Sequence, residues 1–132
     1  MNSELIAEFL RRTNVFAVVG VSRNPEKYGH KVYKDLKEAG HTVYPVNPYL
    51  DELLGDRCYH SLSDLPCKPD VVDTVVPPEL TEKIVRECEA LGIDKVWMQP
   101  GSESELAIAF CKRNGIKVVH GVCVMVKRRT IR

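Results

Sequence analysis

The chain has 132 residues, which fits one domain of ordinary size. Apolar residues make up 44% of the sequence and charged residues 28%, and a formal net charge of +1 gives no global field that would favour nucleic acid or an anionic membrane. No run approaches the roughly 18 apolar residues of a membrane span. The N-terminal stretch also lacks the cationic start and apolar core of a signal peptide. We therefore expect a single cytoplasmic domain over residues 1–132.

The first predicted element is a short helix that Ser3 caps, with Leu5, Ile6, Phe9 and Leu10 on one face. Apolar segments with the length and composition of strands follow at intervals along the chain. These predicted strands are residues 15–21, 41–46, 57–59, 70–76, 94–98 and 116–120.

Amphipathic segments separate these strands. One predicted helix ends at Gly40, and a single helical turn follows Ser61. A longer helix ends at Gly92, and the Ser-x-x-Glu pattern of residues 102–105 predicts a capping box for a helix that ends at Gly115. A basic cluster, residues 127–129 with Arg132, is predicted to be a solvated tail.

Strands that alternate with helices over short connections predict an α/β protein with a parallel sheet. Right-handed crossovers favour a Rossmann-like, doubly wound parallel sheet in three layers, with the expected strand order 3-2-1-4-5-6. A flavodoxin-like order is an alternative that periodicity does not exclude. In this arrangement a ligand crevice lies at the carboxyl ends of the first and fourth strands, beside the loops that follow Gly20, Val46, Val76, Met98 and His120.

The turn after the first strand has the chemistry of an anion site. A strand that enters a helix through glycine leaves backbone N–H groups at the helix start, and the helix dipole adds to their attraction for phosphate. Gly20 permits close approach of the backbone, the Ser22 hydroxyl can donate to a phosphate oxygen, Arg23 offers a planar fork and Lys27 a point charge. The alternative is a tight turn with solvated cations.

The residues around this turn fit NAD poorly. A dinucleotide fingerprint needs Gly-x-Gly-x-x-Gly and an acidic residue at the end of the second strand. Here the turn reads Gly-x-Ser, and the second strand ends in Pro45, Val46, Asn47 and Pro48 without a carboxylate. This stiff edge could instead flank an adenine ring, with Asn47 free to hydrogen-bond it. Alternatively, the prolines simply end the strand.

Four segments extend these observations to most of the chain: VVGVSRNPEKYGHKVYKDL, YPVNPYLDELLGDRCYHSLSDLP, VVDTVVPPEL and KVWMQPGSESELA. In this order they resemble the small stand-alone CoA-binding proteins, which are related to the N-terminal CoA-binding domain of the succinyl-CoA synthetase α subunit. The resemblance runs from about Leu5 to Val126. It implies a Rossmann-like domain that holds coenzyme A.

The resemblance also implies which positions contact the cofactor. Those at the phosphate turn are Gly20, Val21, Ser22 and Arg23, and those beside the nucleotide are Pro45, Val46, Asn47 and Pro48. The positions that border the adenosine are Val76 and Pro77, and those along the pantetheine arm are Met98, Gln99 and Pro100. Cys123 matches a cysteine that commonly follows the last strand.

Catalysis is not expected from this chain. The synthetase α subunit uses a phosphorylated histidine in a second domain, and here only His120 ends a strand on the crevice side. No Ser-His-Asp order or metal-ligand spacing occurs, and five widely spaced cysteines without a Cys-x-x-Cys pair argue against zinc. Cys123 is either a buried cysteine or a site for a mixed disulfide with coenzyme A.

We therefore predict a non-catalytic protein that binds coenzyme A or an acyl-CoA as a small-molecule ligand, with no nucleic-acid or membrane partner. One alternative is a detached CoA-binding subunit of an acyl-CoA synthetase or transferase that needs a partner chain. Another is a nucleotide-sensing or NAD-linked regulator. The sequence leaves open the acyl group, the oligomeric state and whether a protein partner exists.

Overall fold

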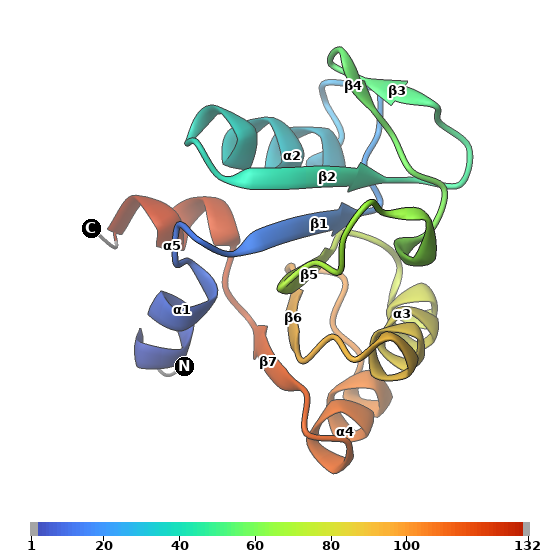
Figure 1. Ribbon diagram of the computed structural model, residues 1–132. Coiled ribbons are helices and arrows are strands. Elements are labelled where there is room, and N and C mark those ends of the chain that lie inside the picture. The colour runs from blue at the N-terminus through green and yellow to red at the C-terminus, as the bar shows by residue number, and fades with distance from the viewer. Residues whose placement is uncertain (1–2, 131–132) are drawn as a thin grey trace.

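The computed structural model describes residues 3–130, which form a parallel sheet with helices on both faces (Figure 1). The strands are β1 (Val15–Val19), β2 (Thr42–Val46), β5 (Val71–Thr74), β6 (Lys95–Met98) and β7 (Lys117–His120). Their order across the sheet is β2-β1-β5-β6-β7, and each neighbouring pair is parallel. The predicted α/β fold class with a Rossmann-like parallel sheet is confirmed.

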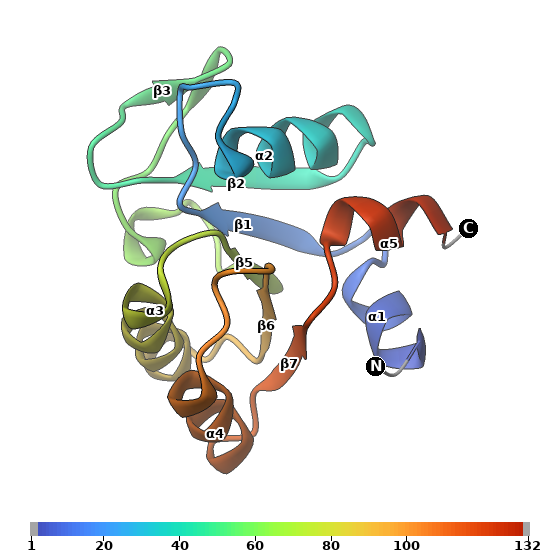
Figure 2. The same ribbon diagram turned by 180° about the vertical axis from the view of Figure 1, so that it is seen from behind.

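Two helical layers cover the sheet. One layer contains α1 (Ser3–Phe9), α2 (Tyr28–Glu38) and α5 (Val124–Thr130), and the other contains α3 (Pro78–Leu91) and α4 (Glu105–Arg113). Figure 2 shows the two groups on opposite sides of the strands. Within residues 3–130, no helix combines the length and the apolar character needed to cross a membrane.

The core has two halves because successive strand residues point to opposite faces. Phe16 and Val18 of β1 pack with the layer of α1, α2 and α5, together with Trp97 of β6. Ala17 of β1 and Val72 of β5 pack with α3 and α4. Burial on both faces explains why β1 reads as a continuous apolar run.

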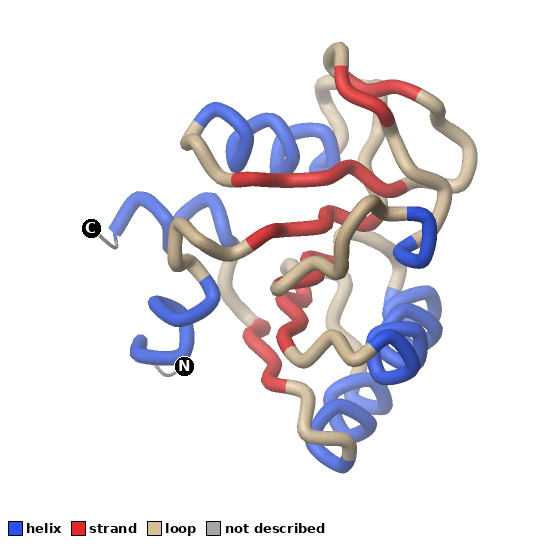
Figure 3. The backbone as a smooth tube through the Cα atoms, in the orientation of Figure 1, coloured by secondary structure: helices blue, strands red, loops and turns tan. Residues whose placement is uncertain are grey.

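The predicted third strand does not form as expected. The chain instead makes a hairpin of β3 (Glu52–Leu53) and β4 (Asp56–Arg57), which lies outside the main sheet in Figure 3. Residues 54 and 55 between them have φ angles of 51° and 83°, as a tight type I′ hairpin turn requires. Only Tyr59 then lies alongside β2, through a single parallel bridge to Val46.

This hairpin changes the strand order in detail. The five parallel strands, counted in chain order, are arranged 2-1-3-4-5, which is the flavodoxin-like order that the periodicity left open. The predicted neighbours of the first, second, fourth, fifth and sixth strands are otherwise as expected. The crossover point between β1 and β5, which places the ligand crevice, is the same in both orders.

The predicted solvated tail is wrong for residues 127–129. They belong to α5, whose Val124 is buried in the core. Nε and Nη2 of Arg128 donate to the two carboxylate oxygens of Asp35 on α2, at 2.5 and 2.6 Å, and Arg129 donates to the same carboxylate at 3.1 Å. Arg128 and Arg129 therefore hold α5 against α2, whereas Arg132 lies outside the described residues.

The start of α4 also differs from the predicted capping box. The N-cap is Ser104, whose hydroxyl oxygen accepts from the backbone N–H of Ala107 at 3.2 Å. Ser102 is buried and its hydroxyl lies 2.8 Å from that of Thr74 and 2.7 Å from that of Thr81. Ser102 therefore joins the end of β5 to α3 rather than capping α4.

Candidate functional site

Two glycines bring the turn after β1 against its neighbours. Gly20 has a φ of 105°, and a Cβ there would lie 2.2 Å from the carbonyl oxygen of Val75. A Cβ at Gly29, in the first turn of α2, would lie 2.1 Å from the carbonyl oxygen of Gly20. The start of α2 therefore packs directly on the turn, which only glycine at both positions permits.

Side chains from α2 and from the loop after β2 fix the peptide groups of this turn. The Nδ1–H group of His30, which is only 6% exposed, donates to the carbonyl of Ser22 at 2.8 Å. Nδ2 of Asn47 donates to the carbonyl of Val21 at 2.7 Å. The Ser22 hydroxyl oxygen accepts from the backbone N–H of Asn24 at 3.1 Å, which leaves its hydrogen available to another acceptor.

The turn presents positive charge at a helix N-terminus. Arg23 and Lys27 are exposed, and Lys27 is the N-cap of the 11-residue helix α2 without a side-chain capping bond. The first N–H groups of a helix have no partner within the helix, and the dipole favours an anion beside them. The turn therefore has the charge and the exposed helix start that an anion site needs, and His30 and Asn47 hold its backbone in place.

A cleft of about 330 Å³ opens beside this turn at the carboxyl edge of the sheet. Its floor is formed by Val19, Val46 and Val76, at the ends of three parallel strands. The loops of residues 47–49 and 60–62 make one wall, and α3 makes the other. The apolar floor and the adjacent anion site suit a ligand with a flat apolar ring and a phosphate.

Charged side chains lie on the walls of the cleft. Lys83 and Glu87 come from α3, and burial raises the pKa of Glu87 above its ordinary value. His60 lies on the opposite wall, where its Nε2 is 2.8 Å from a carboxylate oxygen of Asp51. The floor itself contributes no charge.

A buried polar network lies behind the turn. Gln99 is fully buried, and its Nε2 donates to Oδ1 of Asp73 at 2.6 Å. Its Oε1 accepts from the Tyr28 hydroxyl at 2.9 Å and from the N–H of Val124 at 3.1 Å. The Tyr28 oxygen also lies 2.8 Å from Sγ of Cys123. The network thus joins β5, β6, α2 and the start of α5.

The carboxyl group of Asp73 is incompletely paired. It is fully buried, and its Oδ2 has no hydrogen-bond partner among residues 3–130. Burial raises the pKa of Asp73 to about 8, against the opposing effect of the bond from Gln99. Burial also raises the pKa of Tyr28, and the hydrogen bond with Cys123 adds to this shift. Burial therefore favours the protonated form of this carboxyl group.

Three of the cysteines are core thiols. Cys58, Cys88 and Cys111 are buried, and burial raises the pKa of each, to about 11 for Cys111. Cys67 is exposed and Cys123 is half-buried, and all five are free thiols. Across residues 3–130, no group of three potential metal ligands converges on one point.

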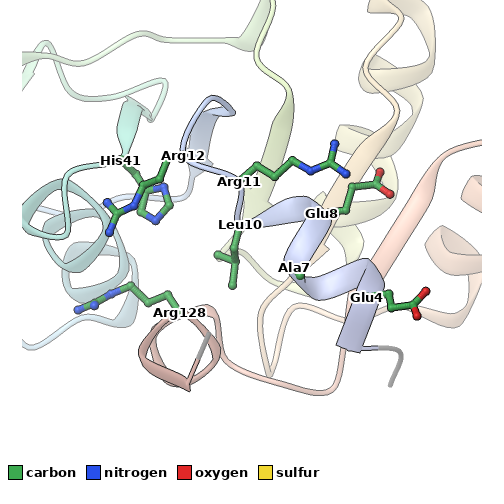
Figure 4. Close-up of a pocket in the computed structure, with 8 residues that line it drawn as sticks. All are labelled: Glu4, Ala7, Glu8, Leu10, Arg11, Arg12, His41 and Arg128. Atoms are coloured by element: carbon green, nitrogen blue, oxygen red, sulfur yellow. The ribbon is translucent and has the colours of Figure 1, made fainter. Parts of the chain in front are cut away.

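A larger cavity, of about 590 Å³, lies at the opposite edge of the sheet (Figure 4). Arg12, His41 and Arg128 gather on one side of it, and Glu8 lies on the other. Arg12 donates to the carbonyl at the end of α2, and Arg128 pairs with Asp35. Burial, and then the charges of Arg12 and Arg128, lower the pKa of His41. These cations already hold α1 and α5 against α2.

The sequence model of the family described as a CoA binding domain matches residues 14–129. The chain belongs to this CoA-binding family. Among curated proteins, it is similar to the protein YneT of Bacillus subtilis (strain 168), with 32% identity over 92% of this chain and 90% of that protein.

Other members of the family are parts of larger enzymes. The α subunit of ADP-forming acetate–CoA ligase II from Pyrococcus furiosus is 38% identical over 61% of this chain, but the match covers only 18% of that subunit. The chain spans less than a fifth of the length of five curated acetate–CoA ligases that it matches.

Solved structures contain the same fold as a small protein. A hypothetical protein from Pyrococcus horikoshii OT3 has a TM-score of 0.93 and 37% identity, and the match covers 99% of this chain and 92% of that chain. A second structure, from Thermus thermophilus, has a TM-score of 0.89 and 32% identity over 98% of both chains.

The structure brings many of the predicted contact residues together. Gly20, Val46, Asn47, Pro48 and Val76 all line the cleft at the carboxyl edge. The remaining predicted residues of the phosphate turn, Val21, Ser22, Arg23 and Lys27, lie in the loop that leaves this cleft for α2. The predicted phosphate and nucleotide segments are therefore neighbours in space.

The other predicted residues lie apart from the open cleft. Pro45 is buried within β2, and Pro77 is the exposed N-cap of α3. Met98 and Gln99 are fully buried, and Pro100 is exposed beyond β6. Contacts of these five residues with coenzyme A stay predictions, and the amide of Gln99 already serves the buried network.

The sequence suggested that the side chain of Asn47 is free to bind an adenine ring, but in the structure its amide is already hydrogen-bonded. Besides its bond to Val21, its Oδ1 accepts from the backbone N–H of Tyr49 at 2.7 Å. Sequence reasoning also missed Gly29 and His30, which shape the phosphate turn. Their only signal was a Gly-His pair in the first helical turn, where neither residue is needed for helix formation.

Proposed function

We propose that this protein binds coenzyme A, with the pyrophosphate at the turn of residues 20–27 and the adenine ring in the adjacent cleft. The observation that carries the proposal is the direct link between these two parts. Asn47 lines the cleft and also holds the Val21 carbonyl of the turn. In coenzyme A the base and the pyrophosphate are only a few bonds apart. Such a ligand matches a cleft and a turn that are joined directly through Asn47.

The composition of the cleft supports coenzyme A over NAD. A ribose diol of NAD is usually bound by a carboxylate at the end of the second strand. β2 ends at Val46 and continues into Asn47 and Pro48, and the one carboxylate that lines the cleft, Glu87, comes from α3. Arg23 and Lys27 supply cations for a ligand that carries more phosphate charge.

In this proposal the protein binds coenzyme A without catalysing a reaction. A second candidate function is that of a CoA-binding subunit which needs a partner chain, and the similarity to the acetate–CoA ligase α subunit of P. furiosus favours it. Co-purification with a larger protein that carries an ATP-grasp domain or a catalytic histidine would support the second candidate. Isolation of the chain alone, with retained coenzyme A and no ligase activity, would support the first.

The test of the binding site is the variant Arg23→Ala. We expect it to weaken coenzyme A binding by about 1.5–3 kcal/mol, the contribution of a hydrogen bond to a charged group. Isothermal titration calorimetry measures this change, and native mass spectrometry of the purified protein shows whether coenzyme A is retained. Folding should be unchanged because Arg23 is exposed on a loop.

Lys34→Ala is the matched control, because it removes an exposed cation from the middle of α2, away from the turn. Its affinity for coenzyme A should equal that of the wild type. If Arg23→Ala and Lys34→Ala both bind like the wild type, Arg23 does not contact the pyrophosphate. If the wild type does not bind coenzyme A at all, the proposed function is wrong.

A further inference from the structure

Two large apolar side chains stand exposed at opposite lips of the cleft. Tyr49 is 90% exposed at the wall formed by residues 47–49, and Leu80 is 44% exposed at the wall formed by α3. Both line the cleft. A flat ring that entered between them would bury apolar surface of both side chains.

The backbone of Tyr49 is held in place while its ring is not. Its N–H donates to Oδ1 of Asn47 at 2.7 Å, and the carbonyl of Asn47 accepts from the N–H of Leu50 at 3.3 Å. Within residues 3–130, the Tyr49 hydroxyl makes no hydrogen bond and its ring contacts no other aromatic ring. An ordered backbone thus presents an unengaged aromatic face at the cleft.

The same asparagine couples this aromatic ring to the anion site. Asn47 orders Tyr49 through Oδ1 and the Val21 carbonyl through Nδ2, both at 2.7 Å. The position of a base against Tyr49 and the position of a phosphate at the turn are therefore set by one side chain. This coupling suits a purine nucleotide better than an unbranched apolar ligand.

We propose that Tyr49 stacks on the adenine ring of coenzyme A and makes the site selective for ligands that carry the adenosine end. The inference rests on the proposed function, because it assigns one contact within that site. Stacking of a base on an aromatic side chain changes affinity by about 10- to 100-fold when the ring is removed. The contact needs only the ring face, so a phenylalanine should replace the tyrosine.

The experiment compares three probes by calorimetry: coenzyme A, adenosine 3′,5′-bisphosphate and 4′-phosphopantetheine. Tyr49→Ala should bind the first two about 10- to 100-fold more weakly than the wild type, and the third equally well. Tyr49→Phe should retain wild-type affinity for all three. Glu52→Ala is the control, because it alters an exposed residue at the start of β3, close to Tyr49 in the chain but outside the cleft.

A chemical readout is independent of any variant. Tyr49 is the one exposed tyrosine of the five, since the others are buried or half-buried. Nitration with tetranitromethane should therefore occur first at Tyr49. Adenosine 3′,5′-bisphosphate should slow that nitration and 4′-phosphopantetheine should not.

The outcomes separate this inference from the proposed function. If the wild type binds coenzyme A and Tyr49→Ala binds it equally well, the stacking contact is refuted and the proposed function stands. An equal loss for all three probes also refutes it, because the residue then acts on the shape of the whole site. If the wild type binds none of the probes, the proposed function and this inference both fall.

Discussion

Asp73 gives the clearest test of the energetics of this fold. Its carboxyl group is fully buried with one oxygen unpaired, and its pKa rises from an ordinary value of 3.8 to about 8. Between these two values the folded protein holds a proton that the unfolded chain has released. Unfolding therefore releases a proton, and the free energy of unfolding falls as the pH rises through this window.

The size of the effect follows from the two pKa values. The slope approaches about 1.4 kcal/mol per pH unit well inside the window and vanishes above the folded-state pKa. Between pH 6 and pH 8 a folded-state pKa of about 8 predicts a loss of about 2 kcal/mol from Asp73 alone. Asp73→Asn should abolish this loss, because the amide cannot ionise and can still accept the bond from Gln99.

The assay is urea unfolding of the wild type and the variant at several pH values. The single tryptophan, Trp97, is fully buried and pairs in register with Asp73 across the sheet, so its fluorescence reports loss of this region. Asp64→Asn is the control, because that carboxyl group is exposed. Other titrating groups are shared by all three proteins and cancel in the differences.

The reasoning would be refuted if the unfolding free energies of the wild type and of Asp73→Asn fell in parallel as the pH rises. If the wild type and Asp73→Asn lose stability by the same amount between pH 6 and pH 8, the carboxyl group does not hold a proton in the folded state. A constant offset between the two curves has the same meaning. We expect the difference in unfolding free energy between Asp73→Asn and the wild type to approach zero at low pH and to grow toward pH 8.

Two further substitutions test how the helices are positioned. Gly29→Ala places a methyl group 2.1 Å from the carbonyl oxygen of Gly20. We therefore expect the unfolding free energy measured in urea to fall by about 1–3 kcal/mol and coenzyme A binding to weaken. Wild-type stability and affinity of this variant would show that α2 does not pack on the turn. Asp35→Ala removes the carboxylate that accepts from Arg128. We therefore expect thermal denaturation to show a stability lower by about 1–3 kcal/mol, and trypsin to cleave faster within α5. An unchanged cleavage rate would contradict the packing of α5 against α2.

The sequence predicted the order and type of the main elements because these depend on local pattern. The continuous apolar run of residues 15–21 identified β1 as a strand covered on both faces, and glycines marked the ends of α2 and α3. The alternation of strands and helices then placed the turn of residues 20–27 at the carboxyl edge of a parallel sheet. The glycine and the cations of the candidate anion site all lie within this turn, so the sequence could predict them, but not the bonds from His30 and Asn47 that hold the turn.

The sequence could not predict contacts between distant segments. Arg128 reads as part of a basic tail until α5 is seen against Asp35, 93 residues away. Asn47 reads as a free amide until its bonds to Val21 and Tyr49 are visible. Gln99 reads as an edge residue until the buried network surrounds it.

The sequence by itself thus determined the fold class, the central strands and the chemistry of the phosphate turn, since each follows from residues close together in the chain. The tertiary structure decided which polar groups are already engaged and which exposed ring faces the cleft. It also decided that residues 52–57 form a hairpin, so that the predicted third strand does not join the sheet. Those outcomes depend on which partners the fold brings within hydrogen-bonding distance, and a local pattern holds no information about that distance.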